Sequence, residues 1–436
     1  MICLRDPDAA HVQLHFSSAI SAGTGMAGRV VSGPAAQPIP AAVTGWGHEL
    51  RSLWAFDPEM IFLNQGAFGA TLRELMVVQT EWRDRMERQT ARFFMGDLPK
   101  LIREAATELA QFLGADPDRT VMVENASSGI MAVLLSQELT PGDEIVLTSH
   151  VYGAVRQAVR HVAARTGARI VEVAVPVPVA GPQDFVSAIA AAITPRARLI
   201  VVDHVASPSS LILPVAQIVA LARQAGVCVV IDGSHAPGLL ALDLNALDAD
   251  YYVGNCHKWL CNPKGAGFIV LGRAAAQAAT LHPVTISHAY GQGVLAEFGK
   301  IGTRDPSAWL TVPSAIAAHE RLGGAALRAR NADMTVAACD AIATHLGTEL
   351  AGPAAMFAAM VSLRLPPEFG AARPETAAAL REALWQSARI EALILPLHGA
   401  LWLRLCGFAY NAESDFAAVA QALDALRDAA AREAGA

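Results

Sequence analysis

The sequence predicts an α/β protein with a large domain, built on a mostly parallel, doubly wound sheet, and a smaller α+β domain after it. The chain has 436 residues, which is enough for two hydrophobic cores. Between residues 120 and 271, short runs of β-branched and other apolar residues alternate with helical patterns. This alternation favours parallel strands joined by helical crossovers. It stops after Asp305 and Pro306, which indicates the second domain.

Each expected strand is a short, mainly apolar run, and each expected helix repeats its apolar residues at helical spacing. In the large domain we expect strands over 120–123, 144–148, 169–173, 198–203, 227–232, 251–255 and 267–271, after a short strand at 60–63. The helices expected there span 72–91, 98–112, 128–139, 152–166, 184–193 and 214–225. In the small domain we expect a helix from 313 to 322 that continues towards 345, strands at 360–365 and 400–405, and helices over 373–387 and 413–431.

The segment from Gly254 to Gly267, GNCHKWLCNPKGAG, carries the most informative chemistry. Its Lys258 follows an apolar strand, and Asp232 ends another such strand earlier in the chain. A desolvated lysine can form a Schiff base with a carbonyl cofactor, and a carboxylate can keep a pyridine nitrogen protonated. This pair predicts pyridoxal 5'-phosphate (PLP). His235 can reach the ring's phenolic oxygen or the substrate, or it can have a structural role.

A phosphate group requires backbone donors at the beginning of a helix. The segment NASSG, at 125–129, supplies them between an apolar strand and an apolar helix. His257 and the pair Gly302-Thr303 are further candidates for the phosphate. Tyr152, at another strand end, can stack its ring on the face of the cofactor.

Seven segments in chain order carry a family resemblance: FLNQGAFG, NASSGIMAV, VYGAV, DGSHAPG, GNCHKWL, GTRDPSAW and RLCGFAYN. Together they resemble the class V aminotransferase family of fold-type I PLP enzymes, and most of all its isopenicillin N epimerase group. The resemblance extends from about residue 56 to the C-terminus. It implies the PLP-dependent transferase fold of type I and a homodimer that shares its active sites.

The resemblance also implies roles for individual residues around the cofactor. Lys258 would carry it, Asp232 would pair with the pyridine nitrogen, and Tyr152 would stack on the ring. With His235, these are the expected catalytic residues. The phosphate would be bound by three residues of one subunit and one of the other, namely Ala126, Ser127 and His257 with Thr303 of the second subunit.

On the substrate side, Arg404 matches the family's arginine that binds an α-carboxylate, as a guanidinium fork does well. Asn64 and Gln65 would flank that carboxylate. The chain departs from the family pattern at Gln65, where histidine is usual, at Cys406, where serine is usual, and at Ser210, where glycine is usual. These departures leave the identity of the amino-acid substrate open.

The cofactor leaves several reactions open after an external aldimine loses its Cα proton to give a quinonoid. We expect an amino-acid epimerase or racemase, with Lys258 on one face of Cα and Tyr152, His235 or His288 on the other. The alternative is a β-elimination lyase that acts on a cysteine conjugate or sulfoxide, and an aminotransferase comes third. A cysteine desulfurase is disfavoured because no cysteine lies between residues 373 and 403. We expect residues 282–298 to form a loop over the active site.

Two other classes of protein are disfavoured. Asp232, Lys258 and Arg404 occur together, which argues against a PLP-fold protein that has lost catalysis. No GxGxxG motif follows the first strand, which argues against a Rossmann-type dehydrogenase.

The amino-acid composition indicates in which compartment the protein works and which binding partners are disfavoured. With 53% hydrophobic and 17% charged residues, the chain is globular, and a net charge of −7 without a basic cluster argues against nucleic acid. No apolar run reaches the ~18 residues of a membrane span. Six scattered cysteines without metal-ligand spacing predict a cytoplasmic protein that binds no metal. We expect a loosely ordered extension over 1–45, a PLP-binding domain over 46–310 whose first part packs on the small domain, and a small domain over 311–436.

Overall fold

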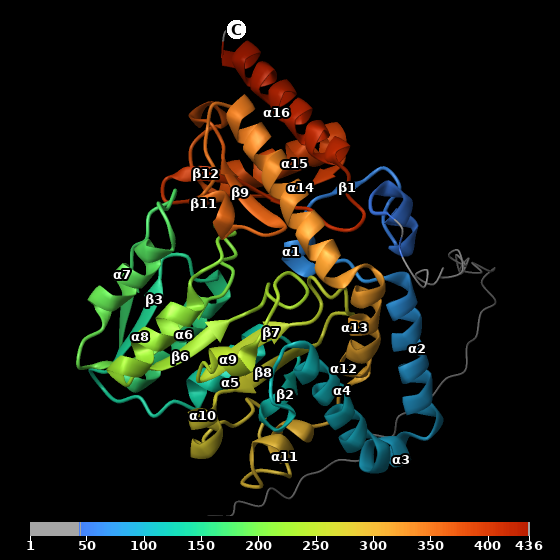
Figure 1. The fold of residues 1–436 in the computed structure, drawn as a ribbon, viewed down its shortest axis with the longest axis vertical. Helices are drawn as coiled ribbons and strands as arrows, with labels where there is room; N and C mark the ends of the chain where they lie inside the picture. Colours follow the sequence, from blue (N-terminus) through green and yellow to red (C-terminus); the bar gives the residue numbers. More distant parts are fainter. Residues whose placement is uncertain (1–42, 44, 435–436) are drawn as a thin grey trace, which may run out of the picture. The chain divides into compact units, whose positions relative to one another are not determined.

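A seven-stranded sheet lies at the centre of the computed structural model, which describes residue 43 and residues 45–434 (Figure 1). The strand order is β2-β8-β7-β6-β5-β3-β4, and only β8 runs against the others. The predicted strands form here, each within one residue of its predicted ends. The strands are β2 (Thr120–Val123), β3 (Glu144–Thr148), β4 (Arg169–Val173), β5 (Ala197–Asp203), β6 (Cys228–Asp232), β7 (Tyr251–Asn255) and β8 (Gly267–Leu271).

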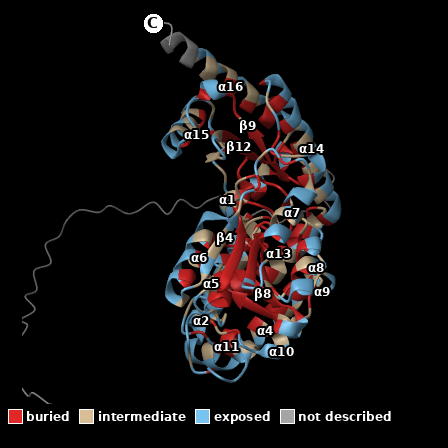
Figure 2. Cartoon of the chain, turned by 90° about the vertical axis from the view of Figure 1, so that its left-hand side faces the viewer, coloured by how far each residue is buried: buried red, intermediate tan, exposed pale blue. Residues whose placement is uncertain are grey.

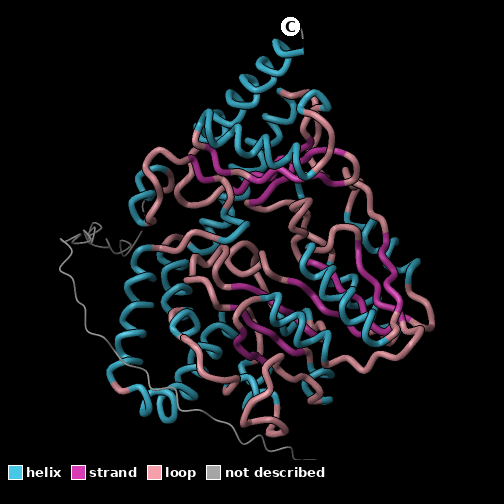
Figure 3. Tube along the Cα trace, turned by 180° about the vertical axis from the view of Figure 1, so that it is seen from behind, coloured by secondary structure: helices cyan, strands magenta, loops and turns pink. Residues whose placement is uncertain are grey.

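Helices cover both faces of this sheet, as a doubly wound fold requires (Figure 3). One expected helix begins two residues early, at Ala126, because the side chain of Asn125 caps it by accepting the N–H of Ser128 at 2.9 Å. The longer helices are α2 (Arg73–Arg88), α4 (Leu98–Phe112), α5 (Ala126–Leu135), α6 (Gly153–Thr166), α7 (Pro182–Ala192) and α8 (Val215–Ala225). The shorter ones are α1 (Gln65–Phe68), α3 (Thr90–Arg92), α9 (Leu244–Leu247), α10 (Arg273–Ala278), α11 (Val294–Gly299) and α12 (Ser307–Leu310), and Phe93–Asp97 forms a π-helical turn.

The smaller C-terminal domain is built on a three-stranded antiparallel sheet in the order β11-β12-β9. Strand β11 was not expected from the sequence. The strands are β9 (Met360–Arg364), β11 (Leu393–Leu397) and β12 (Ala400–Cys406). The helices are α13 (Val312–Arg321), α14 (Gly324–His345), α15 (Pro374–Ala388) and α16 (Glu413–Ala434), and 3-10 turns span His48–Leu53, Pro117–Arg119, Ala354–Met356 and Pro367–Phe369.

The beginning of the described chain pairs with this C-terminal part. Strand β1 (Ile61–Phe62) lies parallel to β10 (Ile390–Glu391), and the N–H of Ile61 donates to the carbonyl of Arg389 at 2.8 Å. The expected extension over 1–45 lies almost wholly outside the described residues, and the division at residue 310 stays a prediction. Among the described helices, none has the length and apolarity that a membrane crossing requires.

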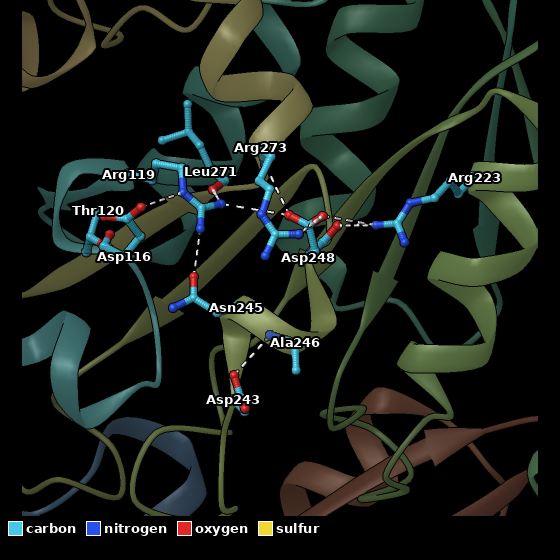
Figure 4. Close-up of polar contacts among 10 residues, drawn as sticks. All are labelled: Asp116, Arg119, Thr120, Arg223, Asp243, Asn245, Ala246, Asp248, Leu271 and Arg273. Atoms are coloured by element: carbon cyan, nitrogen blue, oxygen red, sulfur yellow. Dashed lines mark hydrogen bonds and ion pairs between the residues drawn. The ribbon is translucent and has the colours of Figure 1, made fainter.

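The central strands are almost entirely buried, while the outer surfaces of the helices are exposed (Figure 2). Ion pairs connect several segments near the amino end of β7. There Asp248 lies 3.2 to 3.7 Å from the guanidinium groups of Arg119, Arg223 and Arg273, which come from three separate segments (Figure 4). Because several charges share one carboxylate, this network stabilises more than an isolated surface pair would. The candidate site described below lies at the other end of these strands, their carboxyl end.

Candidate active site

The candidate site lies at the carboxyl ends of the parallel strands, where ligands of open α/β sheets bind. The loops after β3, β5, β6 and β7 meet there, and β12 of the small sheet reaches them through Arg404. A cavity of about 790 Å³ opens at this point. Its walls include Asn64, Gly66, Phe68, Tyr152, Ser207, Lys258, Arg404 and residues of α15 and β11.

Among the described residues, none forms an ion pair with the amine of Lys258. Its Nζ lies 3.1 Å from Nε2 of His235, and its carbonyl accepts from Nε2 of Gln65 at 2.7 Å. Burial lowers the pKa of Lys258 from 10.5 to about 8, although the charge of Asp232 raises it in part. About a tenth of the amine is therefore unprotonated at pH 7 and about half at pH 8, far more than for an ordinary lysine.

The loop that carries Lys258 is held in place by the NQGAFG segment. Gly69 has φ of +68°, and a Cβ atom at this position would lie 1.9 Å from the carbonyl oxygen of His257. Only glycine tolerates both the backbone conformation and this approach. The segment 64–69 therefore packs directly on the backbone at His257 and Lys258.

Asp232 ends β6 behind Lys258 and is 3% exposed. The N–H of Ser234 donates to its Oδ1 at 2.9 Å, and the hydroxyl of the same serine donates to that oxygen too. Burial raises the pKa of Asp232, whereas the two bonds from Ser234 and the charge of Lys258 lower it. A cationic group that binds beside this buried carboxylate would stabilise its ionised form.

The two histidines beside Lys258 have lowered pKa values, which favours their neutral imidazole form. Burial lowers the pKa of His257 to about 4, and the charge of Lys258 lowers it further. Burial and the same lysine hold the pKa of His235 well below its usual range. Nδ1 of each ring is buried without a hydrogen-bond partner in the described structure. Each imidazole therefore has one nitrogen left for a ligand.

Arg404 lies in the wall of the cavity. It is 1% exposed, and the described residues place no carboxylate within ion-pair distance of it. Its Nη1 donates to the carbonyl and the hydroxyl of Ser207 at 2.9 and 3.1 Å, and Nη2 donates to Oδ1 of Asn64 at 3.4 Å. Nε has no partner. A buried guanidinium held by neutral groups alone favours binding of an external anion.

The structure does not bring every predicted site residue into this cavity. Ala126 donates its N–H to Oδ1 of Asn255 at 2.9 Å, and Ser127 lines a separate cavity of about 360 Å³ beside it. Thr303 is exposed. Residues 283–285 line the cavity at Ser127 and are not in the wall of the cavity at Lys258, and the loop expected over the active site at 282–298 stays a prediction.

Gln65 lies beneath the cavity rather than in its wall. It is fully buried, and its Oε1 accepts from the hydroxyl of Tyr410 at 2.8 Å and from the N–H of Ala70 at 3.0 Å. Its amide nitrogen donates to the carbonyl of Lys258. Both polar atoms of the Gln65 side chain are therefore occupied, and they hold α1 against the loop that carries Lys258. Cys406 is likewise buried, and burial raises its pKa.

Several residues of the site were missed in the sequence. Ser207 binds Arg404, Asn255 binds the first turn of α5, and Asp203 ends β5 beside Asp232. Asp203 had a signal, since it closes an apolar strand as Asp232 does. Arg381 and Glu391 reach the cavity from α15 and β10, and no local pattern in the sequence indicates it.

The residues present fit PLP. Asp232 can face a pyridinium nitrogen, and Lys258 can bind its carbonyl carbon. Nδ1 of His235 and of His257 is unpaired, although neither histidine is in the wall of the cavity. In the first turn of α5 the N–H groups of Ala126 and Ser128 are already bound by Asn255 and Asn125, and the exposed Ser127 is the residue there that can donate to a phosphate. The described residues contain no group of three or more His, Cys, Asp or Glu side chains that could hold a metal ion.

Known proteins resemble this chain in sequence and in fold. The family model "Aminotransferase class-V" matches residues 71–367. An isopenicillin N epimerase of Streptomyces clavuligerus is 34% identical over 403 residues, which cover 88% of this chain and 99% of that protein. A probable chloroplastic L-cysteine desulfhydrase of Arabidopsis thaliana is 28% identical over 85% of this chain and 83% of its own length. The cystine C–S lyase C-DES has a TM-score of 0.72 at 20% identity, over 84% of this chain and 97% of that one, which supports the fold.

Replacing Arg404 by lysine tests the anion site. Lysine keeps the charge but loses the fork, so we expect amino-acid binding to weaken by roughly 10- to 100-fold, as the loss of hydrogen bonds to a charged group predicts. Cofactor affinity should change by less than about threefold, because Arg404 binds Ser207 and Asn64. Both are measured by titration of the bound cofactor's absorption.

Arg381→Lys is the matched control, because Arg381 lines the same cavity but donates to the carbonyl of Ile394. It should leave amino-acid binding nearly unchanged. If Arg404→Lys releases the cofactor while amino-acid binding to the remaining holoenzyme stays normal, Arg404 does not bind the substrate.

Proposed function

The chain belongs to the class V aminotransferase family and is an enzyme whose cofactor is PLP, and we propose that it is an amino-acid epimerase or racemase. The observation that carries its action on amino acids is the joint position of Lys258 and Arg404 in one cavity. The amine of Lys258 would carry the cofactor that receives the α-amino group of an amino acid. The buried guanidinium of Arg404, which has no carboxylate partner, would bind the α-carboxylate. The similarity to isopenicillin N epimerase over nearly the whole of that protein supports the reaction.

When bound, PLP supplies an electron sink for the negative charge that develops at Cα. Asp232 holds the ring nitrogen protonated, and Arg404 with Asn64 orients the α-carboxylate. The free amine of Lys258 removes or returns the Cα proton on one face. The neutral imidazole of His235 lies 3.1 Å from this amine, so it accepts or donates on the same side as Lys258.

Inversion at Cα requires a second acid or base on the opposite face. The cavity wall contains three further acids, of which Glu382 accepts a hydrogen bond from Gln386, leaving Tyr152 and Glu391 as candidates. Burial raises the pKa of Glu391, which keeps more of it in the protonated form that can deliver a proton. His288 is not in this wall. We therefore propose Tyr152 or Glu391 as the partner of Lys258.

The second candidate function is a β-elimination lyase that acts on a cysteine conjugate or sulfoxide. It is favoured by the similarity to several L-cysteine desulfhydrases, at 28% to 31% identity. Elimination requires one base, and Lys258 provides it. Among the described residues, no cysteine lines the cavity at Lys258. The wall therefore lacks the thiol that a cysteine desulfurase needs to accept sulfur, which favours the lyase over a desulfurase.

The deciding experiment incubates the PLP-loaded enzyme with amino acids and cysteine conjugates in deuterated water. Products are followed by chiral chromatography and mass spectrometry. Deuterium at Cα with inverted configuration and an intact side chain is the expected result. A keto acid with a released thiol or sulfenate would establish the lyase, and an aminated cofactor would establish an aminotransferase.

We also propose a homodimer that works in the cytoplasm. Large apolar side chains are exposed at the cavity, namely Phe68 at 76% and Tyr152 at 45%, and Tyr290 in the segment 282–298 is 60% exposed. Monomeric proteins seldom expose so many large apolar groups together. Thr303 is exposed as well, as a residue that contacts a second subunit must be in a single chain. The five cysteines in the described part of the chain are unpaired, as in reducing compartments.

Sedimentation analysis of the purified holoenzyme tests the dimer, and we expect twice the chain mass of 45.8 kDa. Tyr290→Asp should shift the protein towards monomer because it places a charge in the apolar interface. Glu368→Lys, which changes the charge of an exposed residue in the small domain, serves as control. A wild-type protein that sediments as a monomer at micromolar concentration would contradict the proposal.

A further inference from the structure

A second buried acid lies beside Asp232 at the carboxyl edge of the sheet. Asp203 is the last residue of β5, and it pairs in register with Asp232, the last residue of β6. In-register neighbours on parallel strands point to the same face and lie about 4.8 Å apart along the hydrogen-bonding direction. The two carboxyl groups therefore share one small region beneath the cofactor site.

The two acids have unequal partners. Asp203 is 2% exposed and Asp232 is 3% exposed. Asp232 accepts the N–H and the hydroxyl of Ser234, whereas Oδ2 of Asp203 is buried without any partner in the described structure. A buried anionic oxygen without a donor is costly, but a protonated carboxyl avoids most of that cost. The asymmetry favours the proton on Asp203.

We propose that Asp203 is a second acid of the cofactor site which keeps its proton at neutral pH, so that the pair carries one negative charge, on Asp232. Its role in a PLP site rests on the function proposed above. Asp203 is a positioning residue, because it acts through Asp232 and Lys258. A second charge there would favour the ammonium form of Lys258 and reduce the nucleophilic amine.

The surrounding charges agree with this assignment. Burial raises the pKa of Asp203 well above its usual range, and the charge of Asp232 raises it further, while the N–H of Tyr152 and the charge of Lys258 lower it. From β7, Tyr252 faces Asp232, and burial keeps the pKa of its hydroxyl well above the usual value. Arg404 and His257 act on the neighbouring lysine and imidazole, not on Asp203.

Infrared difference spectroscopy measures the proton directly. The carbonyl stretch of a protonated carboxylic acid is compared at neutral pH in wild type, Asp203→Asn and Asp232→Asn, with and without PLP. Isotopic labelling of aspartate carboxyl groups separates this band from that of Glu391, whose pKa burial also raises. We expect a protonated aspartate band in wild type that Asp203→Asn removes and Asp232→Asn retains.

Cofactor affinity provides a second readout. Asparagine is neutral, as a protonated Asp203 is, so Asp203→Asn should bind PLP within about threefold of wild type. Asp232→Asn should bind at least about tenfold more weakly, because it loses a charged hydrogen bond. An equal loss in both variants would show that Asp203 carries a charge, and would overturn the proposal.

The wild-type spectrum alone can also reject the inference, even if a variant fails to fold, because the absence of any protonated aspartate band at neutral pH would do so. Where both variants fold, a band that Asp232→Asn abolishes while Asp203→Asn keeps it would reject the inference too. The cofactor-free spectrum does not depend on PLP chemistry. If wild type fails to bind PLP, the proposed function fails while the protonation of Asp203 is still decided.

Discussion

The removal of the Lys258 amine from water is the physical constraint on which the rest of the site depends. Burial lowers its pKa to about 8, and the charge of Asp232 limits that shift without cancelling it. An ionised Asp203 also acts to raise the pKa of Lys258, which is why the protonation of Asp203 matters. Neutral His235 and His257 add hydrogen-bonding capacity to the region without adding charge.

The scaffold keeps this arrangement rigid through close backbone contacts. Gly69 lets the segment 64–69 pack on the carbonyl of His257, and Gln65 then binds the carbonyl of Lys258. Strand β12 reaches the same point, because Arg404 donates to Ser207 in the loop after β5. Sequence segments more than 300 residues apart thus meet within one cavity, and each is held by backbone or buried polar contacts rather than by surface ion pairs.

Much of this arrangement could be predicted from the sequence because its signals are local. Apolar runs that end in Asp232 or precede Lys258 define the strands and their polar ends, and the ordered motifs indicate the family. Residues brought in by tertiary packing carry no such signal. Glu391 comes from a two-residue strand that forms only against β1, and Gln65 is turned inwards by Tyr410 and Lys258. The segment 282–298 lies at the cavity beside Ser127 because α11 packs against β2, a contact that composition does not encode.

The most direct test of the account is the rate at which cofactor-free protein captures PLP, measured against pH. Free lysine in the same series gives the pH dependence of the cofactor itself. The corrected rate should rise about tenfold per pH unit and level off near the pKa of about 8 that Lys258 has here. Lys264→Ala should behave as wild type and Lys258→Ala should capture nothing. A rate that rises on towards the ordinary lysine pKa of ~10.4, or capture that survives Lys258→Ala, would contradict the central claim.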